Sequence, residues 1–470
     1  MEKSLQLKNK KITVMGLGLN QGGLGVAKYL AKAGAKLLIT DLKTEKELAS
    51  SLKELKNFDN IQYTLGKHRD EDFINKDMII QNPAVPHDSK YLQIARGHGI
   101  PVETDLSLFL KICPSKKLIA VGGTKGKSTV TNLIYHIFHH AGKDIVQAGN
   151  IGISVFEVLP VITSQTIVLL EISSWQLEGL AQMYFRPPVA VLTNIMADHL
   201  DRYDVFDDYV YSEKLIYKYQ NKSDYLITSM DNLLTKNITN ETQANIFWFS
   251  TKNKVTQGSY LDEDNKLIFI DRNKSIEFAR ANDIKLPGRH NISNILAAAN
   301  VCFIYNLPLS SIKEGIKSFP GVPNRLEKIK TLKGINFYND TCATTPDATI
   351  AALQSFPTEP LILILGGKDK KLNYDELCQV IKRKKNIAYL FILQHSEYNA
   401  SELIWNGLQK LNLKDKIECC SSLTEAVQKA YHKAHPGTNI ILSPAATSFG
   451  MFSNEFERGN VFRETVANLS

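Results

Sequence analysis

Four residues at the end of a glycine-rich loop have the types and spacing of a phosphate-binding site. Gly123, Gly126, Lys127 and Ser128 lie in the stretch VGGTKGKSTV, between the apolar run KLIA and the helix-like TNLIYHIFHHAGK. In a P-loop the backbone amides surround the phosphates, the lysine reaches them and the serine hydroxyl binds Mg²⁺. The usual pattern GxxxxGK[ST] begins with Gly where this chain has Val121, so the loop GTKGKS is a variant. We predict that it binds a nucleotide.

Polar residues near the ends of two further apolar strands are candidates for the same site. Glu171 ends the run VLLE, and Asp198 and His199 follow VAVLTNIMA. In a parallel sheet the carboxyl ends of the strands face the ligand crevice. Each residue alone is more typical of a structural or solvated position, but beside a P-loop they favour a metal–phosphate site. Lys214 lies on the predicted helix FDDYVYSEKLIYKYQ and by itself indicates only a solvated charge.

A second glycine-rich turn lies near the N-terminus. GLGLNQGGLG (16–25) follows a first strand, and Asp41 ends the second strand. Glycines in such a turn let the backbone approach phosphates at a helix N-terminus. The spacing is GxGxxxG rather than GxGxxG, so NAD, another nucleotide and a purely structural turn all stay open.

Three stretches of alternating strand and helix patterns must position these residues. The first begins KKITVMGLG, the second carries the P-loop, and the third has the strands INFYND, LILILGG, AYLFIL and TNIILSP. Such alternation predicts an α/β fold with parallel sheets covered by helices. Turns at KICPSKK and SFPGVPNRLE separate the stretches, so we predict domains at residues 1–112, 113–320 and 321–470.

Composition limits the classes of function. The chain has 470 residues, of which 43% are hydrophobic and 22% charged, and it lacks an apolar stretch long enough to span a membrane. Its basic start passes directly into a strand, so we expect no signal peptide. The six cysteines are scattered, which favours reduced cytosolic thiols over disulfides or zinc. The net charge of +8 suits small anionic substrates better than nucleic acid, because the basic residues do not cluster with aromatic ones.

A series of short motifs spans the chain in one order: GTKGKS, GNIG (149–152), EISSWQLE (171–178), NIMADHLDRY (194–203), EK (213–214), GRHNISN (288–294), PNRLE (323–327), NDT (339–341) and LSPAATSF (442–449). In this order the sequence closely resembles the Mur ligases, in particular those that add D-glutamate. The resemblance implies a Rossmann-like N-terminal domain for a UDP-sugar, a central P-loop ATPase-type parallel sheet, and a Rossmann-like C-terminal domain for the incoming amino acid.

The resemblance also implies an activity. An ADP-forming ligase of this family transfers the γ-phosphate of ATP to the carboxylate of UDP-N-acetylmuramoyl-L-alanine, and the amine of D-glutamate then displaces phosphate from the acyl phosphate. This step belongs to peptidoglycan precursor synthesis, which supports cell shape and division. The implied cofactors are ATP, two Mg²⁺ ions and a carbamate formed from CO₂ on Lys214. We expect a cytoplasmic monomer without nucleic-acid partners or membrane insertion.

The resemblance assigns roles to individual residues. For ATP they are Gly123, Thr124, Lys125, Gly126, Lys127, Ser128, Thr129, Asn291, Asn294, Arg325 and Asp340. For the UDP-sugar they are Gly18, Leu19, Asn20, Asp41, Lys43, Asn150, Ser173, Asp198 and His199. The implied metal ligands are Ser128, Glu171, His199 and Lys214, and the implied catalytic residues are Lys127, Glu171, His199 and Lys214. For the amino acid they are Thr344, Lys370, Ser448 and Phe449. Arg325 and Asp340 are expected to complete the site after domain closure.

Five positions depart from the family pattern, and NQGG resembles a small insertion in the first loop. Asn324 replaces the histidine of PHR, Cys342 the lysine of NDSKATN, Gly450 the aspartate of SFD, Ser453 a lysine, and Ala84 the glycine of NPGVP. None lies in the predicted ATPase core, so they bear on amino-acid specificity rather than on ligase chemistry.

Other functions stay open at this point. A related Mur-type ligase would add a different amino acid, for example L-glutamate, and a folylpolyglutamate-type ligase would not depend on UDP-N-acetylmuramoyl-L-alanine. A dehydrogenase would use the 16–25 turn for NAD but would leave the P-loop and Glu171 without a role. A P-loop switch or regulator would bind or hydrolyse ATP without depending on a second substrate.

Overall fold

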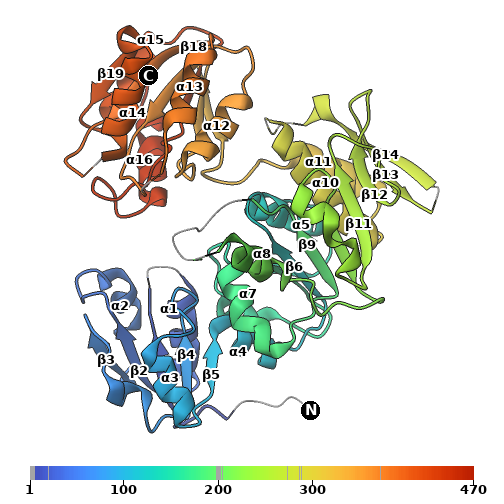
Figure 1. The fold of residues 1–470 in the computed structure, drawn as a ribbon, viewed down its shortest axis with the longest axis vertical. Coiled ribbons are helices and arrows are strands. Elements are labelled where there is room, and N and C mark those ends of the chain that lie inside the picture. The colour runs from blue at the N-terminus through green and yellow to red at the C-terminus, as the bar shows by residue number, and fades with distance from the viewer. Residues whose placement is uncertain are drawn as a thin grey trace. The chain divides into compact units, whose positions relative to one another are not determined.

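The computed structural model describes residues 6–18, 21–196, 203, 205–272, 274–284, 286, 288–370, 372–397 and 399–470. These residues form three sheets covered by helices (Figure 1). The chain divides into two compact units, one with residues 1–284 and 292–319 and the other with residues 285–291 and 320–470. No helix among the described residues is long and apolar enough to cross a bilayer.

The first sheet is parallel throughout, in the order β3-β2-β1-β4-β5. After their first residues the apolar strands β1 and β2 are buried, as expected for a sheet covered by helices. The strands are β1 (Lys11–Met15), β2 (Lys36–Asp41), β3 (Ile61–Leu65), β4 (Met78–Gln81) and β5 (Val102–Thr104). The helices are α1 (Gln21–Lys32), α2 (Ala49–Leu55), η1 (Asp70–Phe73), α3 (Lys90–Gly97) and α4 (Asp105–Ile112).

The second sheet has the order β14-β13-β12-β11-β10-β9-β6-β8-β7, and only its last three strands along the chain form antiparallel pairs. Its strands are β6 (Leu118–Gly122), β7 (Ile145–Gly149), β8 (Ile167–Glu171), β9 (Val189–Leu192), β10 (Tyr225–Ser229), β11 (Asn245–Ser250), β12 (Gly258–Leu261), β13 (Lys266–Asp271) and β14 (Lys274–Arg280). The helices are α5 (Lys127–His140), α6 (Val155–Val158), η2 (Leu159–Val161), α7 (Ser174–Leu180), η3 (Ala181–Met183), α8 (Phe206–Lys214), α9 (Leu233–Lys236), η4 (Asn237–Asn240), η5 (Ala281–Asp283), α10 (Arg289–Ile304) and α11 (Leu309–Ser318).

The first two sheets share one hydrophobic core within the first unit. Tyr29 of α1 stacks on Phe156 of α6 with ring centroids 4.6 Å apart, and Phe109 of α4 meets the same ring edge-on. Such aromatic contacts add to the free energy gained from area burial. The domain boundary predicted at 112/113 falls between α4 and β6 and stays a prediction.

The third sheet lies in the second unit, in the order β15-β16-β20-β17-β18-β19, with only β15 antiparallel. Its strands are β15 (Glu327–Leu332), β16 (Ile335–Asn339), β17 (Leu361–Leu365), β18 (Ile387–Leu393), β19 (Ile417–Cys420) and β20 (Asn439–Leu442). Its helices are α12 (Pro346–Gln354), α13 (Asp375–Arg383), α14 (Asn399–Lys410), η6 (Lys414–Lys416), α15 (Leu423–Lys433) and α16 (Glu455–Ala467).

Strand β17 explains why its sequence, LILIL, is apolar at every position. Leu361, Leu363 and Leu365 belong to one hydrophobic cluster, whereas Ile362 and Ile364 belong to another. Alternate side chains of a strand point to opposite faces, so both faces of this sheet are buried.

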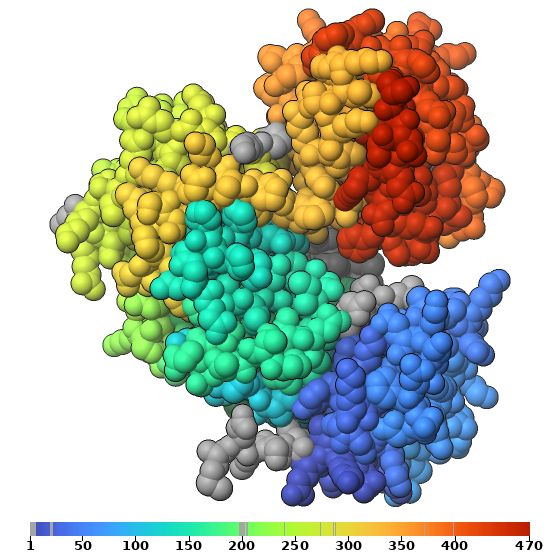
Figure 2. Space-filling model, turned by 180° about the vertical axis from the view of Figure 1, so that it is seen from behind, coloured from blue at the N-terminus to red at the C-terminus, as the bar shows by residue number. Residues whose placement is uncertain are grey.

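The C-terminal residues pack against the start of the second unit. Figure 2 shows the dark-red C-terminal residues beside the amber residues that follow position 320. Lys330 Nζ donates to the carbonyls of Val466 and Ala467.

The register of the second sheet brings three predicted site segments to one edge. Val121 of β6 pairs with Glu171 of β8, Gly149 of β7 pairs with the same Glu171, and Gly122 pairs with Leu192 of β9. Because these strands are parallel, the P-loop, Glu171 and the segment after β9 all lie at their carboxyl ends.

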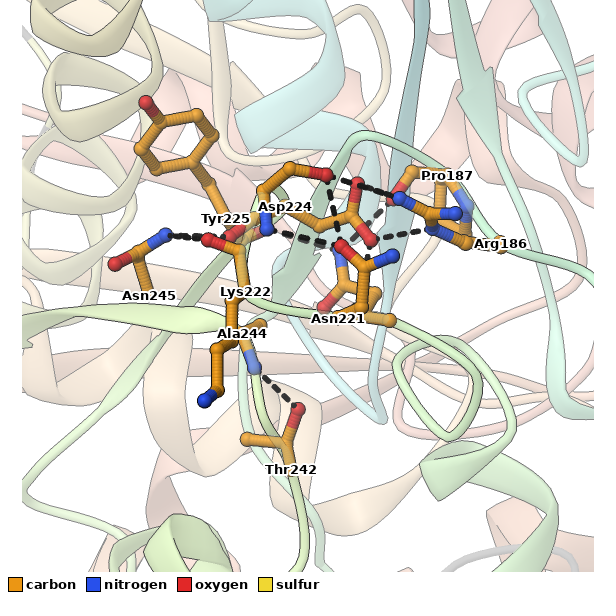
Figure 3. A network of polar contacts seen from close by, with 11 residues as sticks. Arg186, Pro187, Asn221, Lys222, Asp224, Tyr225, Thr242, Ala244 and Asn245 are labelled. Atoms are coloured by element: carbon orange, nitrogen blue, oxygen red, sulfur yellow. Dashed lines mark hydrogen bonds and ion pairs between the residues drawn. The ribbon is translucent and has the colours of Figure 1, made fainter.

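A polar network holds the opposite ends of β9, β10 and β11 together (Figure 3). The Asp224 carboxylate accepts hydrogen bonds from Arg186 Nε at 2.6 Å and from the Asn221 amide at 2.8 Å. Asn245 Nδ2 donates to the carbonyls of Lys222 and Asp224 at 2.7 and 3.2 Å. The Asp224 side chain is only 4% exposed, so its charge depends on these donors.

We expect Asp224→Asn to lower the apparent free energy of unfolding by about 1–3 kcal/mol, because it removes the buried charge that accepts from Arg186 and from the Asn221 amide. Urea titration of the purified chain measures this change. The matched control is Asp264→Asn, which breaks the exposed pair with Lys266 and should leave the urea midpoint unchanged. Equal midpoints for the wild type and Asp224→Asn would contradict this account of the network.

Candidate functional site

The P-loop joins β6 to α5 in a conformation suited to phosphate. Gly126 caps α5 with a φ of +90°, a backbone region that favours glycine. An added Cβ at Gly126 would lie 2.4 Å from Asn294 Oδ1, so the Asn294 amide lies directly against the loop. Lys127 Nζ donates to the carbonyls of Gly123 and Thr124 at 2.6 and 3.1 Å. Lys127, the cation predicted to contact the phosphates, thus lies at the N-terminus of α5. The N-terminus of a helix also favours the binding of anions.

The carboxylate that anchors this loop, Glu213, was not among the predicted site residues. Glu213 of α8 is buried, and its Oε2 accepts a hydrogen bond from the Gly123 amide at 2.9 Å. The Tyr209 hydroxyl donates to Glu213 Oε1 at 2.9 Å and lies 2.7 Å from the Thr124 hydroxyl. Glu213 precedes Lys214 in the sequence, so the same helix end that carries Lys214 is attached to the P-loop. The EK motif at 213–214 was the one signal that could have marked Glu213, because a glutamate beside a lysine on a helix otherwise looks like a solvated pair.

The segment after β9 holds the other side of the loop. Asn194 Oδ1 accepts from the Lys125 amide at 3.0 Å, and its Nδ2 donates to the Lys125 carbonyl at 2.9 Å. The Thr124 amide donates to the Asn194 carbonyl at 2.9 Å. The loop is therefore preorganised by protein bonds on two sides. Thr129 follows Lys127 and Ser128 in the first turn of α5.

Glu171 has the environment expected of a metal ligand. It is buried at the end of β8, and its Oε1 accepts from Asn150 Nδ2 at 2.8 Å. Its Oε2 is also buried and has no hydrogen-bond partner among the described residues. A buried carboxylate oxygen without a partner is costly, and a bound cation removes that cost. The residues present fit Mg²⁺, which binds through one or two carboxylates and substrate phosphates.

Lys214 ends α8, and its Nζ donates to Glu241 Oε1 at 2.8 Å. The Tyr217 hydroxyl donates to Glu241 Oε2 at 3.1 Å, and burial together with this charge raises the pKa of Tyr217. His199, the predicted metal-ligand partner of Lys214, and Asp198, a predicted UDP-sugar residue, lie outside the described residues. Within the described parts of the chain, no three His, Cys, Asp or Glu side chains converge as a metal site.

In the first sheet, Asp41 connects two predicted UDP-sugar residues. Its Oδ2 accepts from the Gly18 amide at 3.1 Å, and its Oδ1 accepts from the Lys43 amide at 2.9 Å. Leu19 and Asn20 were also predicted and lie outside the described residues. Ser173 caps α7 through a reciprocal pair of bonds with Gln176 and lies two residues after Glu171.

Three predicted ATP residues belong to the second unit. Asp340 follows β16 and is buried; its Oδ2 accepts from the Ser443 hydroxyl at 2.8 Å and its Oδ1 from the Leu326 amide at 2.9 Å. Burial raises the pKa of Asp340 to about 7, against the opposing effect of these two bonds. Arg325 is exposed, and Asn291 lies in the first turn of α10.

The four predicted amino-acid residues follow strands that are neighbours in the third sheet. Thr344 comes after β16, Lys370 after β17, and Ser448 and Phe449 after β20. β20 pairs in parallel with both β16 and β17, so the three loops emerge at one edge. Ser448 is buried, whereas Lys370 and Phe449 are exposed. The fold brings these loops together, as expected for ligand loops at the carboxyl ends of parallel strands.

The structure shows the surroundings of two residues that depart from the family pattern, Asn324 and Cys342. Asn324 has a φ of +65°, which asparagine adopts more readily than other non-glycine residues. Its Oδ1 accepts from Asn339 Nδ2 at 2.9 Å and from Arg463 Nη2 at 3.2 Å. Cys342 is half-buried, and burial raises the pKa of its thiol to about 11.

Comparison with solved structures identifies the fold. The UDP-N-acetylmuramate–alanine ligase from Thermotoga maritima superposes with a TM-score of 0.64 at 21% identity, covering 97% of this chain and 99% of that chain. A pseudomurein peptide ligase type C from Methanothermus fervidus superposes with a TM-score of 0.57 at 18% identity, covering 98% and 100%. The predicted α/β fold class is thereby confirmed.

Sequence comparison gives the family. The chain matches the MurD-like N-terminal domain at residues 10–104, the Mur ligase middle domain at 121–302 and the Mur ligase glutamate ligase domain at 324–446. Proteins named UDP-N-acetylmuramoylalanine–D-glutamate ligase from Roseiflexus sp. and Borreliella afzelii are 35% and 36% identical to it. The matches cover 99% of this chain and 100% and 99% of those relatives. A chain that matches such relatives over its whole length, and all three domain families in order, belongs to the Mur ligase family.

Proposed function

We propose that this chain is the ATP-dependent ligase that adds D-glutamate to UDP-N-acetylmuramoyl-L-alanine. The observation that carries the proposal is its full-length similarity to relatives named for this activity. The preorganised P-loop and the buried Glu171 also support the proposal, because such a pair suits phosphate transfer. A dehydrogenase or a simple nucleotide switch gives no role to this combination.

The first step joins a carboxylate to a phosphate, and the two repel each other. An oxygen of the L-alanine carboxylate attacks the γ-phosphorus of ATP, the bond to the β–γ bridging oxygen breaks, and ADP leaves. The protein must neutralise charge on both reactants. We assign this work to Lys127 and to the amides of the loop at the N-terminus of α5, with Asn291 and Asn294 on the adenine side and Arg325 and Asp340 as further ATP contacts.

Magnesium, when bound, supplies positive charge to the phosphates. We propose that Ser128 and Glu171 hold one ion and that His199 and a carbamate on Lys214 hold a second. A carbamate turns the Lys214 ammonium into an oxygen donor of suitable charge. Asn150 keeps Glu171 oriented through the 2.8 Å hydrogen bond to Oε1, which leaves Oε2 for the metal.

The second step forms the amide bond. The amine nitrogen of D-glutamate attacks the acyl carbon, and phosphate leaves with the oxygen that came from the carboxylate. We propose that Lys370 and the hydroxyls of Thr344 and Ser448 bind the carboxylates of this substrate, because ionised acceptors favour such donors. Gly18, Asp41, Lys43 and Ser173 bind the UDP-sugar in this proposal. The enzyme acts in the cytoplasm as a monomer.

The function is tested by phosphate release from ATP with UDP-N-acetylmuramoyl-L-alanine and a panel of amino acids. D-Glutamate should be used faster than D-alanine or D-lysine, because only a second carboxylate uses the full set of donors. It should be used faster than L-glutamate because the full-length relatives are named for the D isomer. ATP turnover that is independent of the UDP-sugar would contradict the ligase assignment. Faster use of another amino acid would overturn the D-glutamate assignment alone.

Lys127→Ala should lower kcat/KM by roughly 10²–10³-fold, because it removes a cation that stabilises charge at the transferring phosphate. Steady-state rates of ligation measure the loss. The matched control is Lys117→Ala, which removes an exposed lysine just before β6 whose Nζ contacts only Gln165 among the contacts described. Near-normal turnover of Lys127→Ala would remove the P-loop lysine from the mechanism.

Lys214→Ala should be nearly inactive, and a small carboxylic acid in solution should restore part of the activity by supplying the missing oxygen donors. The matched control is Lys218→Ala, one turn further along the chain, where Nζ lies over the Tyr211 ring at 4.3 Å. This control should keep its activity and gain nothing from the acid. A Lys214→Ala variant with most of its activity would show that Lys214 is only a helix charge paired with Glu241.

A further inference from the structure

Arg458 of α16 is fully buried, although a buried charge is unfavourable unless hydrogen bonds compensate it. Its Nε donates to the Thr341 hydroxyl at 3.0 Å, and its Nη2 donates to the Thr341 carbonyl at 2.9 Å. Nη1 and Nη2 both donate to the Ala446 carbonyl at 3.2 Å. A single side chain therefore joins the loop after β16 to the loop after β20.

These two loops carry residues that we assign to the amino-acid substrate. Thr341 lies three residues before Thr344, and Ala446 lies two residues before Ser448. The planar guanidinium group fixes the donor directions, so it sets the spacing of the two loops more tightly than a flexible ammonium group does.

The loop after β20 needs such an anchor because its backbone is strained. Ala445 has a φ of +62°, in the left-handed region that residues with a side chain rarely adopt. A strained residue keeps its conformation only where the surroundings hold it. The carbonyl of the next residue, Ala446, accepts hydrogen bonds from Arg458. Arg458 therefore helps to hold Ala445 in its strained conformation.

The third loop is attached to the same segment. The amides of Lys368 and Thr447 donate to each other's carbonyls at 3.0 and 3.1 Å, and the Thr447 hydroxyl donates to the Lys368 carbonyl at 2.9 Å. Gly367 permits this approach, since an added Cβ would lie 2.0 Å from the Thr447 carbonyl oxygen. Lys368 precedes Lys370 by two residues, so the position of Lys370 also depends on the loop that Arg458 holds.

Asp340 is held separately from this arrangement. Ser443 and Leu326 donate to its two carboxylate oxygens, whereas the hydrogen bonds of Arg458 described above go to Thr341 and Ala446. Loss of Arg458 should therefore disturb the amino-acid loops more than Asp340.

We propose that Arg458 is a positioning residue for the amino-acid site, which acts through Thr341 and Ala446 to set the spacing of the loops that carry Thr344, Lys370 and Ser448. This inference rests on the proposed function. It adds a residue on a helix that carries none of the predicted substrate contacts.

The test measures the KM for D-glutamate, ATP and UDP-N-acetylmuramoyl-L-alanine in Arg458→Met and Arg458→Lys. Arg458→Met should raise the KM for D-glutamate roughly tenfold or more, while the other two KM values change by less than about twofold. Arg458→Lys should be intermediate, because it keeps the charge but not the two-sided donor geometry. Equal shifts of all three KM values, or an unchanged KM for D-glutamate, would overturn the proposal.

A milder pair of variants keeps the test decisive if Arg458→Met does not fold. Thr341→Val removes the hydroxyl that accepts from Arg458 Nε at little change in volume, and it should raise the KM for D-glutamate roughly two- to fivefold. The control Thr331→Val removes an exposed hydroxyl that donates to Asn336 Oδ1, and it should match the wild type. An unchanged KM for D-glutamate in a folded Thr341→Val would overturn the proposal.

The wild-type measurement separates the two claims. If the wild type releases no phosphate in response to D-glutamate, the proposed function fails and the inference fails with it. If the wild type responds and the variants show no selective change, only the role of Arg458 fails.

Discussion

The hydrogen bond from the Gly123 amide to the Glu213 carboxylate ties the nucleotide loop to helix α8. The loop and the end of α8 are far apart in the sequence, and both carry residues with proposed roles at the phosphates. Asn194 fixes the opposite side of the loop through the Lys125 backbone. Because protein groups already hold the loop, little reorganisation is needed when phosphate binds, and such preorganisation is a main source of catalytic stabilisation.

Buried carboxylates next to a phosphate site have to be balanced by partners. Glu213 accepts from a backbone amide and from Tyr209, so it is satisfied by the protein. Glu171 has one satisfied oxygen and one without a partner among the described residues, which is the arrangement that a divalent cation completes. In the second unit both buried charges have protein partners, because Asp340 has donors on both oxygens and Arg458 donates to acceptors in two loops. Of these four groups, Glu171 is the one left with a buried oxygen for a ligand.

The sequence predicted those features that depend on local patterns. The α/β fold followed from alternating strands and helices, and the P-loop and Glu171 followed from their places at the ends of apolar strands. The roles of Glu213 and Arg458 could not be predicted, because a charged residue on a helix looks the same in the sequence whether it is solvated or buried against a loop. Their roles arise from pairing between segments up to 117 residues apart, as between Arg458 and Thr341. Asn324 shows the same limit, since its positive φ became visible only in the folded chain.

The central claim is that the P-loop transfers phosphate to a carboxylate rather than to water. It is tested most directly with UDP-N-acetylmuramoyl-L-alanine whose L-alanine carboxylate carries ¹⁸O on both oxygens, followed by mass spectrometry of the phosphate released during ligation. An acyl phosphate intermediate requires the bridging oxygen to leave with phosphate, so we predict one ¹⁸O atom in each phosphate and one in each amide product. Phosphate without ¹⁸O would mean that water attacks ATP, and it would contradict the account.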